Sequence, residues 1–462
     1  MKQLILFLIP FSLFSCKKKT DEFKPPFSTD VKKLNFNFFG GEETIAVSSD
    51  ISWKISTKPS WVTLDKIQGT GNGSVQILVA QSTDAKFLHS AIFFSDGSST
   101  AIDSVIVEQG FQVPTLVNES KYNVVSPSFG AYGTFVMKEK EGNFVGVGTV
   151  SNPVNSNGVI TKLDITGKII WQKDVSDLAY TNLNSCDEGE DGYVAAGRHL
   201  SSGWIVNMAK DGSNVKWKKS VTYPNADLVF FNTIKKTSFG FICGGGVYNS
   251  AAGKTTPYLY AIDASGNKLW EKLPDISELT SGSIQNITIK DQSMFMSISN
   301  LAAGKFESIA IKTDLQGTIS WKKIFSEAGG LIGNAVASVK DGFIIGNTRQ
   351  GNAYYDVITR LDDNGNIAWS KSFRVTAGGL AIRAIDTSDD SILIGSNSFD
   401  KGMTVGYVYK LTSAGKMIWN SQITDNKNVY IYGISSSNDG YIVTGNRQNS
   451  DGDNVWLAKY KF

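Results

Sequence analysis

The fold is decided by the stretch Leu259-Tyr260-Ala261-Ile262-Asp263-Ala264-Ser265-Gly266-Asn267-Lys268-Leu269-Trp270, in which two short apolar segments flank a polar turn. Apolar segments joined by Asp, Ser, Gly and Asn are typical of a β-hairpin. The Gly-to-Trp end of this stretch recurs along the chain, as the pairs Gly167 and Trp171, Gly212 and Trp217, Gly266 and Trp270, Gly317 and Trp321, Gly365 and Trp369, and Gly415 and Trp419. The hairpin therefore belongs to a repeated structural unit.

A second series of positions gives the period of this repeat. A turn residue precedes an apolar run at Gly142, Gly192, Gly240, Gln292, Gly342, Asp390 and Gly440, and the successive differences between these positions are 50, 48, 52, 50, 48 and 50 residues. Each repeat accommodates four strands, which we predict for the fifth repeat at Ala335–Lys340, Phe343–Gly346, Tyr355–Leu361 and Asn366–Ser370. Four-stranded units of this period with no helical segment between them predict a seven-bladed β-propeller over residues 113–462.

The two ends of the repeat region complement each other. The seventh unit, from Val429 to Phe462, has three predicted strands and lacks the Gly-to-Trp strand. An additional strand is predicted at residues 121–126, before the first unit begins at Thr134. Because an open ring would leave unpaired strand edges, we expect the two chain ends to pair and to close the ring.

The hairpin also resembles the repeat of quinoprotein propellers that bind pyrroloquinoline quinone (PQQ) and of their cofactor-free relatives. The residues that carry this resemblance are Leu259–Trp270 and Leu163–Trp171. The resemblance implies a propeller fold and no activity, since the chain lacks the adjacent Cys pair of that family. No cofactor is therefore expected. Kelch repeats fit less well, because a double Gly occurs only around Gly244–Gly246.

The N-terminus has the pattern of an export signal. Lys2 precedes an apolar segment from Leu4 to Leu13, and Leu13-Phe14-Ser15-Cys16 resembles the lipobox of bacterial lipoproteins. The resemblance implies a signal peptide over residues 1–15 and acylation of Cys16, with residues 16–30 as the lipidated Cys and a linker. Lys17 resembles outer-membrane sorting, and the choice between the periplasmic face and the cell surface stays open.

Residues 31–112 are predicted to form a small immunoglobulin-like β-sandwich. Six short segments are predicted as strands, and Trp53 and Trp61 are core candidates. Ser52–Ile55, Pro59–Val62, Gly71–Val75 and Val105–Gly110 resemble the BACON domain of Bacteroidota surface proteins, although Phe87-Leu88-His89 departs from that family. The family was proposed to bind carbohydrate. We favour a spacer role for the domain here. The six segments are Leu34–Phe38, Thr44–Val47, Ser52–Ile55, Val75–Val79, Ala91–Phe94 and Ser104–Val107.

Charge and cysteine content exclude some classes of function. The 45 basic and 43 acidic residues are interspersed and give a net charge of +2, so the chain has no electrostatic footprint for nucleic acid. Once Cys16 is lipidated, only Cys186 and Cys243 remain. They lie at different points of neighbouring repeats, so inert buried thiols are favoured over a disulfide.

Residues that recur in several repeats are expected to serve the fold. Asp164, Asp263, Asp314 and Asp362 precede a Gly by three residues, which indicates turn capping rather than a ring of carboxylates. The repeated Trp residues are predicted to dock one blade against the next.

Other chemical candidates are weak. His89 and His199 are the only histidines, so a site of several His is excluded, and His199 is expected to be an ordinary loop residue. Asp451–Asn454 is interpreted as a solvated turn rather than a calcium loop. The acidic groups Glu188, Glu190 and Asp191, and Asp389 and Asp390, are interpreted as solvated hairpin turns rather than a glycosidase pair. Gly244–Gly246 indicates close backbone packing.

Three segments break the repeat, at Asn152–Asn157, Tyr248–Pro257 and Phe399–Thr404, and we expect any ligand contact there. The favoured hypothesis is an outer-membrane-anchored, non-catalytic binding or scaffolding lipoprotein whose propeller loops contact a glycan or a partner protein. The alternative is a propeller enzyme, either a carboxylate glycosidase or lyase acting on polysaccharide or a quinoprotein-like oxidoreductase. Cys16 is the only functional residue assigned. No catalytic, cofactor-binding or metal-binding residue is assigned.

Overall fold

The computed structural model shows an all-β protein, as predicted. Among the residues that it describes there is no α-helix, and hence no helix long and apolar enough to cross a bilayer. Contacts divide the chain into two compact units, with the boundary after Gln109. The described residues are 26–36, 40–80, 88–98, 100–109, 115–121, 131–151, 155–176, 180–327, 330–349, 354–375, 380–388, 391–400, 402–423, 428–449 and 452–461.

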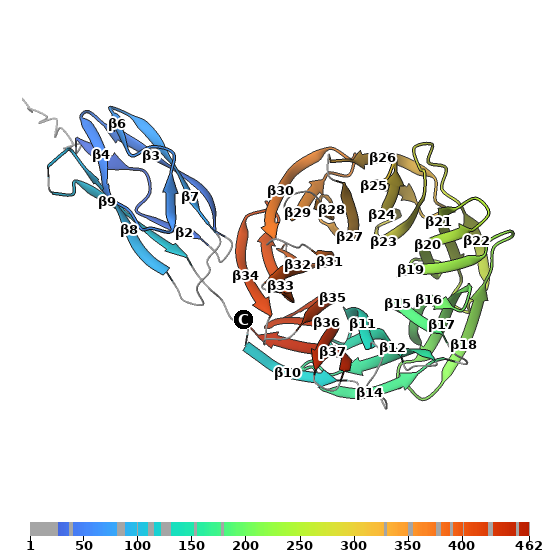
Figure 1. Ribbon diagram of the computed structural model, residues 1–462. Helices are drawn as coiled ribbons and strands as arrows, with labels where there is room; N and C mark the ends of the chain where they lie inside the picture. The colour runs from blue at the N-terminus through green and yellow to red at the C-terminus, as the bar shows by residue number, and fades with distance from the viewer. Residues whose placement is uncertain are drawn as a thin grey trace, which may run out of the picture. The chain divides into compact units, whose positions relative to one another are not determined.

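The first unit consists of two sheets (Figure 1). One has the strand order β1-β3-β7-β5, and the other β2-β9-β8-β4-β6. Most pairs are antiparallel, whereas β2 and β9 are parallel. The strands are β1 (Phe27–Thr29), β2 (Lys33–Phe36), β3 (Gly41–Ser49), β4 (Ser52–Thr57), β5 (Val62–Leu64), β6 (Gln68–Thr70), β7 (Gly73–Val79), β8 (Leu88–Ser95) and β9 (Asp103–Gln109).

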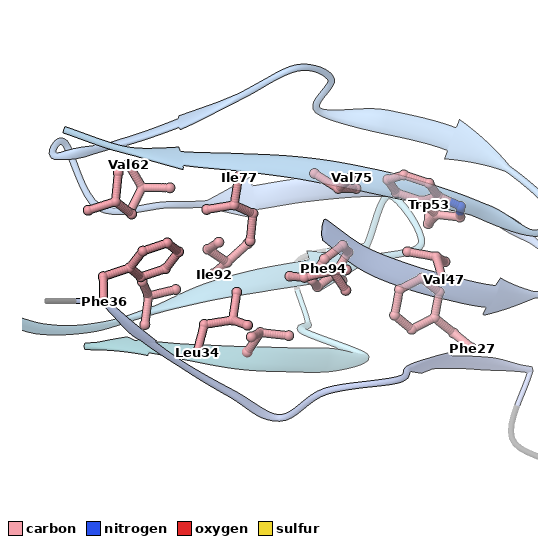
Figure 2. Close-up of a cluster of buried hydrophobic side chains, with 14 residues drawn as sticks. Phe27, Leu34, Phe36, Val47, Trp53, Val62, Val75, Ile77, Ile92 and Phe94 are labelled. Atoms are coloured by element: carbon pink, nitrogen blue, oxygen red, sulfur yellow. The ribbon is translucent and has the colours of Figure 1, made fainter. Parts of the chain in front are cut away.

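One apolar cluster fills this unit (Figure 2). Buried residues alternate with exposed ones along β7, as expected for strands with one face on a core. Trp53 is buried between Phe27 and Phe94, and its indole nitrogen donates to the Gly71 carbonyl at 3.1 Å. Trp61 packs against the cluster while partly exposed. Both tryptophans therefore contribute to the core, as predicted.

In the second unit, the described residues form four-stranded antiparallel sheets arranged in a ring (Figure 1). Six sheets follow the chain order. They are β11 (Ala131–Lys138), β12 (Phe144–Ser151), β13 (Ser156–Leu163) and β14 (Ile169–Asp174); β15 (Thr181–Glu188), β16 (Gly192–His199), β17 (Ser202–Ala209) and β18 (Val215–Val221); β19 (Leu228–Lys236), β20 (Phe241–Asn249), β21 (Lys254–Ile262) and β22 (Lys268–Lys272); β23 (Gly282–Lys290), β24 (Ser293–Ala302), β25 (Lys305–Asp314) and β26 (Ile319–Phe325); β27 (Leu331–Val339), β28 (Gly342–Arg349), β29 (Tyr354–Leu361) and β30 (Ile367–Val375); and β31 (Leu380–Ser388), β32 (Ser391–Asp400), β33 (Met403–Thr412) and β34 (Met417–Ile423).

The remaining sheet of the ring joins the two ends of the repeat region. Its order is β10 (Thr115–Lys121), β37 (Gly452–Lys461), β36 (Gly440–Asn449) and β35 (Val429–Ser437). The pairing of β10 with β37 confirms the prediction that the chain ends complement each other. The strand that makes this pairing, β10, covers residues 115–121, so it begins six residues before the predicted position, and residues 122–126 of the prediction lie outside the described residues. The strand begins earlier because its ladder runs from Thr115 opposite Lys461 to Lys121 opposite Trp456.

Packing between sheets explains the sequence of the second and third strands. β20 is buried at seven consecutive positions, whereas the outermost β22 is half-buried to exposed. A strand that is covered by a neighbouring sheet on each face needs apolar or small residues at every position rather than at alternate ones. The first strands contact one another from sheet to sheet around the ring, and β11 also contacts β35, β36 and β37. The ring is therefore closed.

The repeated tryptophans dock one sheet on the next, as predicted. Trp171 donates from its indole nitrogen to the Lys210 carbonyl of the next sheet at 3.2 Å. A Cβ atom built on Gly212 would lie 2.6 Å from Trp171 Cδ2, so the indole lies directly on that glycine. The same contact joins Trp217 to Gly266, Trp321 to Gly365, and Trp369 to Gly415. Trp270 and Trp419 differ, since Trp270 packs in an apolar cluster and Trp419 stacks on Tyr441.

The repeated aspartates cap turns, as predicted. Asp263 Oδ1 accepts from the backbone N–H groups of Ser265 at 2.9 Å and Asn267 at 2.8 Å. Hydrogen bonds from the Asn267 side chain and backbone hold the pKa of the Asp263 carboxyl below its ordinary value. Equivalent pairs of backbone bonds occur at Asp164, Asp314 and Asp362. A carboxylate used in this way is occupied by its own turn.

Candidate functional site

The three segments that break the repeat occupy equivalent places in three sheets. Each one lies at the hairpin between the second and third strands, although residues 152–154 of the first segment lie outside the described residues. Tyr248–Pro257 and Phe399–Thr404 are mostly strand rather than loop, because Tyr248 pairs with Thr255 and Phe399 with Thr404. The expectation that these two segments are irregular loops was therefore wrong for their paired residues.

These hairpins share one end of the ring with the beginnings of the first strands. Ala131, the first residue of β11, pairs with Val150, and the next residue of β12, Ser151, pairs with Ser156 across the hairpin. In an antiparallel sheet, the first strand thus starts beside the hairpin that joins the second and third strands. We call this end the entry end. The turn aspartates, in the hairpins between the third and fourth strands, lie at the opposite end.

The first strand of each sheet lies nearest the centre of the ring (Figure 1) and carries a β-bulge at the same point. The ladder skips one residue at Thr134, Asn184, Asn232, Gln285, Asn334 and Tyr432, and it is irregular between Leu380 and Ala384, where Arg383 lies. A bulge re-aims the extra side chain and is frequent next to functional sites. Here it repeats around the axis of the ring.

Several bulge residues are fixed by hydrogen bonds to the next sheet. Asn184 Nδ2 donates to the Phe231 carbonyl at 2.8 Å, and Asn232 Nδ2 donates to the Ile284 carbonyl at 2.8 Å. Thr134 Oγ1 donates to the Leu183 carbonyl at 2.6 Å. Each donor therefore satisfies the carbonyl that precedes the next bulge. When the nitrogen of an Asn side chain is held in this way, its amide oxygen is also fixed in position and can accept a hydrogen bond.

Gln285 departs from this pattern. Its Nε2 atom bonds to Ser283 of its own strand, at 2.9 Å from Oγ and 3.3 Å from the carbonyl oxygen. Replacement of this side chain would thus remove a bond within β23 rather than a bond to a neighbouring sheet. A substitution of Gln285 can therefore change the centre of the ring without removing a hydrogen bond between sheets.

The bulges line a cavity of about 340 Å³ at the centre of the ring. A volume in this range is typical of small-ligand sites, which combine aromatic or apolar walls with a few fixed polar groups. The lining residues come from the middle of the first strands, and they are polar or aromatic with a few aliphatic groups. They are Tyr132, Thr134, Phe135, Asn184, Ser185, Asn232, Thr233, Gln285, Asn286, Arg383, Ala384, Ile385, Tyr432 and Ile434.

One charged group lies among the described lining residues, the guanidinium of Arg383. It is accessible to solvent and lies 5.8 Å from the centre of the Tyr432 ring. Burial among surrounding atoms lowers the pKa of Arg383, whereas Tyr432 raises it. An arginine stays protonated at neutral pH in either case. Tyr432 stacks on Tyr430 with centroids 6.2 Å apart, and Tyr132 meets it edge-on at 6.3 Å.

The acidic candidates from the sequence lie elsewhere and have partners. Glu188 is buried, pairs with Lys210 at 2.7 Å and accepts from the backbone of Lys140 at 2.8 Å. Asp191 pairs with Lys216. The prediction of a solvated turn was therefore wrong for Glu188, which is a buried tie at the end of β15, whereas Asp191 is exposed at the turn. Asp389, Asp390 and Asp451 lie outside the described residues, and within the described part no group of three His, Cys, Asp or Glu side chains is placed to hold a metal ion.

The remaining candidates serve the fold. Cys186 and Cys243 are free buried thiols, as favoured, and burial raises the pKa of both. His199 was expected in a loop, but it is the last residue of β16, and its Nδ1 lies 2.9 Å from Thr181 Oγ1 on the neighbouring strand. A Cβ atom on Gly245 would lie 1.9 Å from the Phe230 carbonyl oxygen, which confirms close packing in this Gly run.

The sequence contains a signal for the cavity that the repeat consensus does not reveal. Asn184 precedes the turn residue Gly192 by eight positions, and Asn232 precedes Gly240 by the same distance. A polar or aromatic residue occupies this place in all repeats, seven or eight positions before the turn: Thr134, Asn184, Asn232, Gln285, Asn334, Arg383 and Tyr432. The pattern is hidden because a bulge shifts the alternation of strand faces by one residue.

No protein-family model matches the sequence, and no curated protein matches it. Similar solved structures include the Dos1 propeller, with 10% identity and a TM-score of 0.47 over 75% of this chain and 95% of that one. A europium-containing methanol dehydrogenase has 10% identity and a TM-score of 0.43 over 72% and 78% of the two chains. Sqt1 from Chaetomium thermophilum has 10% identity and a TM-score of 0.43 over 72% and 82%. No ligand or activity is transferred from them.

Proposed function

We propose that the protein is a lipid-anchored, non-catalytic binding lipoprotein whose second unit, a seven-bladed propeller, binds a glycan or a partner protein at the central cavity. The observation that carries this proposal is the cavity at the bulges. Its walls combine fixed amide and hydroxyl groups with tyrosine rings, and its side chains differ from sheet to sheet although the surrounding repeat is regular. Variation at one point of a regular ring favours a role in recognition, because packing alone would favour repetition.

The cavity favours binding over acid–base catalysis. Glycosidases use two carboxyl groups flanking the scissile bond. Among the described residues that line the cavity there is no carboxylate and no imidazole. Amide and hydroxyl groups with fixed partners are suited to hydrogen bonding with a ligand rather than to proton transfer at neutral pH.

The other parts of the chain are assigned supporting roles in this proposal. Residues 31–112 form an immunoglobulin-like, BACON-like spacer, and the acylated Cys16 with residues 17–30 anchors the protein to the outer membrane. These assignments rest on the sequence resemblances, and Cys16 lies outside the described residues. Two or more acyl chains on one residue suffice for stable membrane attachment.

The proposal is tested by blocking the cavity. Gln285→Trp places a large ring at a position whose side chain bonds only within its own strand. The full chain and this variant are compared on glycan arrays and in co-purification from membranes of the source cells. We expect the variant to lose the ligands that the unmodified protein retains, while its melting temperature changes by less than about 3 °C.

Gln316→Trp is the matched control. Gln316 is exposed in a turn at the end of the ring opposite to the entry end, so the same change should leave binding intact. Equal binding by wild type and Gln285→Trp would contradict the proposal. Turnover of a retained glycan by the wild type would favour the enzymatic alternative.

A further inference from the structure

We propose that the cavity recognises an acidic saccharide, with Arg383 binding the carboxylate of a uronate and the tyrosines and bulge amides binding the sugar ring. This inference rests on the proposed binding function and names the ligand class of the same site. It follows from the charge of the cavity lining, because Arg383 is accessible and the other described lining residues are uncharged.

Arg383 is suited to a carboxylate of the ligand. No described Asp or Glu side chain forms an ion pair with it, and it is accessible within the cavity. Its guanidinium lies over Tyr432, a position in which a ring holds the cation without neutralising it. Guanidinium groups form paired, parallel hydrogen bonds with carboxylates, and such bonds are stronger between charged partners than between neutral ones.

A second cation adds to the positive potential. The ammonium group of Lys235, from β19, lies 5.0 Å from the centre of the ring of Phe135, and Phe135 lines the cavity. Lys235 is not among the lining residues, whereas Arg383 is. The acidic part of a ligand is therefore expected on the Arg383 side of the cavity.

The uncharged groups are suited to sugar hydroxyls. The nitrogens of Asn184 and Asn232 are bonded to carbonyls of the next sheet, and their amide oxygens accept no hydrogen bond from the described residues. A sugar hydroxyl can donate to such an oxygen and accept from another group at the same time. Tyr132 and Tyr432 supply ring faces with polar tips, which suit ligands that have both apolar and hydroxyl-bearing sides.

The test measures binding of the full chain to trigalacturonate, trimannuronate and a chondroitin tetrasaccharide by titration calorimetry. The methyl ester of trigalacturonate serves as the uncharged ligand of equal shape. We expect at least one acid to bind, and its affinity to fall by tenfold or more in Arg383→Met. For a galacturonate ligand, the methyl ester should bind tenfold or more weakly, with no further loss in the variant.

Two further variants separate charge from geometry. Arg383→Lys keeps the charge but loses the paired donors, so its affinity should lie between those of wild type and Arg383→Met. Arg349→Met is the matched control, since Arg349 lies over the ring of Tyr355 at 4.1 Å but does not line the cavity. It should bind as wild type does. Unchanged melting temperatures verify that all variants fold.

The outcomes distinguish this inference from the proposed function. Failure of all three acids to bind, equal affinity for acid and ester, or full affinity of Arg383→Met would each overturn the acidic ligand class. None of these results bears on the Gln285→Trp comparison, which decides by itself whether the cavity is a binding site. Loss of acid binding in Arg383→Met with retention in Arg349→Met would support the inference.

Discussion

The indole of Trp321 lies flat on Gly365 of the next sheet, and its nitrogen donates to the Asp363 carbonyl of the same turn at 2.9 Å. Gly365 has a φ of +83°, so the turn already favours glycine. A Cβ atom there would lie 2.8 Å from Trp321 Cδ2. One glycine thus serves two demands at once, a left-handed turn in its own hairpin and an open surface for the tryptophan of the preceding sheet.

The first prediction separates these two demands. Gly365→Ala should destabilise the protein by about 3 kcal/mol or more, since it combines backbone strain with displacement of the half-buried Trp321 ring. Gly402→Ala is the matched control, because Gly402 has a φ of +85° and a Cβ atom added to it would meet no other atom within 4 Å. It should cost only about 1 kcal/mol. Denaturant unfolding measures both values, and equal costs would show that the indole contact contributes little.

The second prediction concerns closure of the ring. Deletion of residues 455–462 removes most of β37, which pairs with both β10 and β36. The edges of both strands would be exposed, so we expect loss of cooperative unfolding and aggregation. Light scattering after size-exclusion chromatography measures this. Deletion of Phe462 alone, which follows the last paired residue, is the control. A monomeric truncation that melts at the wild-type temperature would contradict ring closure by this strand.

The third prediction uses a buried carboxyl group. Asp356 accepts hydrogen bonds from Tyr409 Oη at 2.7 Å, Thr348 Oγ1 at 3.2 Å and Ser396 Oγ, and no described basic group pairs with it. Burial raises the pKa of Asp356 to about 6, against the opposing effect of these bonds. Because the folded pKa lies above the unfolded one, stability present below pH ~4 is lost as the pH rises through ~6.

Asp356→Asn removes this pH dependence. Relative to wild type, the variant should gain up to about 3 kcal/mol between pH 4 and pH 7. Asp314→Asn is the control, because a carboxyl whose pKa is lowered by folding loses its stabilisation only below pH ~4, so the difference from wild type should stay nearly constant between pH 4 and pH 7. Partial burial raises the pKa of Asp314, but hydrogen bonds from Thr318 and Gln316 outweigh this effect and hold the pKa below its ordinary value. Urea unfolding at the two pH values measures both differences. If the stability difference between Asp356→Asn and wild type did not change with pH, folding would not shift the pKa of Asp356.

The fourth prediction tests the hydrogen bonds around the cavity. Asn232→Ala removes the bond to the Ile284 carbonyl and should cost about 1–2 kcal/mol. Asn232→Asp should cost more, because an acceptor would then face a carbonyl. Gln285→Ala is the control, since that side chain bonds within its own strand, and it should stay within about 0.5 kcal/mol of wild type. Thermal unfolding ranks the three variants. A cost at Gln285 equal to that at Asn232 would argue against the bond between sheets.

The fifth prediction concerns the lipid anchor. Cys16→Ser should move the protein from the membrane fraction to the soluble fraction, because the serine cannot carry the acyl chains. Metabolic labelling with a palmitate analogue should label the wild type and not the variant. Ser15→Ala, which keeps a small residue before the Cys, should remain labelled and membrane-bound. Detergent-free retention of Cys16→Ser in the membrane fraction would contradict the tether.

The sequence by itself determined the repeat, its strands and the roles of its recurring residues. The spacing of Gly365 and Trp369, and of their equivalents, placed the hairpins, because a tight turn and a docking ring are local demands that repeat with the unit. It also indicated how the two chain ends complement each other. The position of the extra strand was missed by six residues, since the register of β10 is set by β37, far away along the chain.

Only the tertiary structure decided where a site can lie. Thr134 and Tyr432 are almost three hundred residues apart in the sequence, yet ring closure brings both to one cavity. The repeat pattern indicated the closure but not which side chains it brings together, and the bulge that turns these side chains inward is defined by the partner strand that lacks the extra residue. The proposed role of Arg383 also depends on the tertiary structure, because the sequence does not show that the other side chains lining the cavity are uncharged.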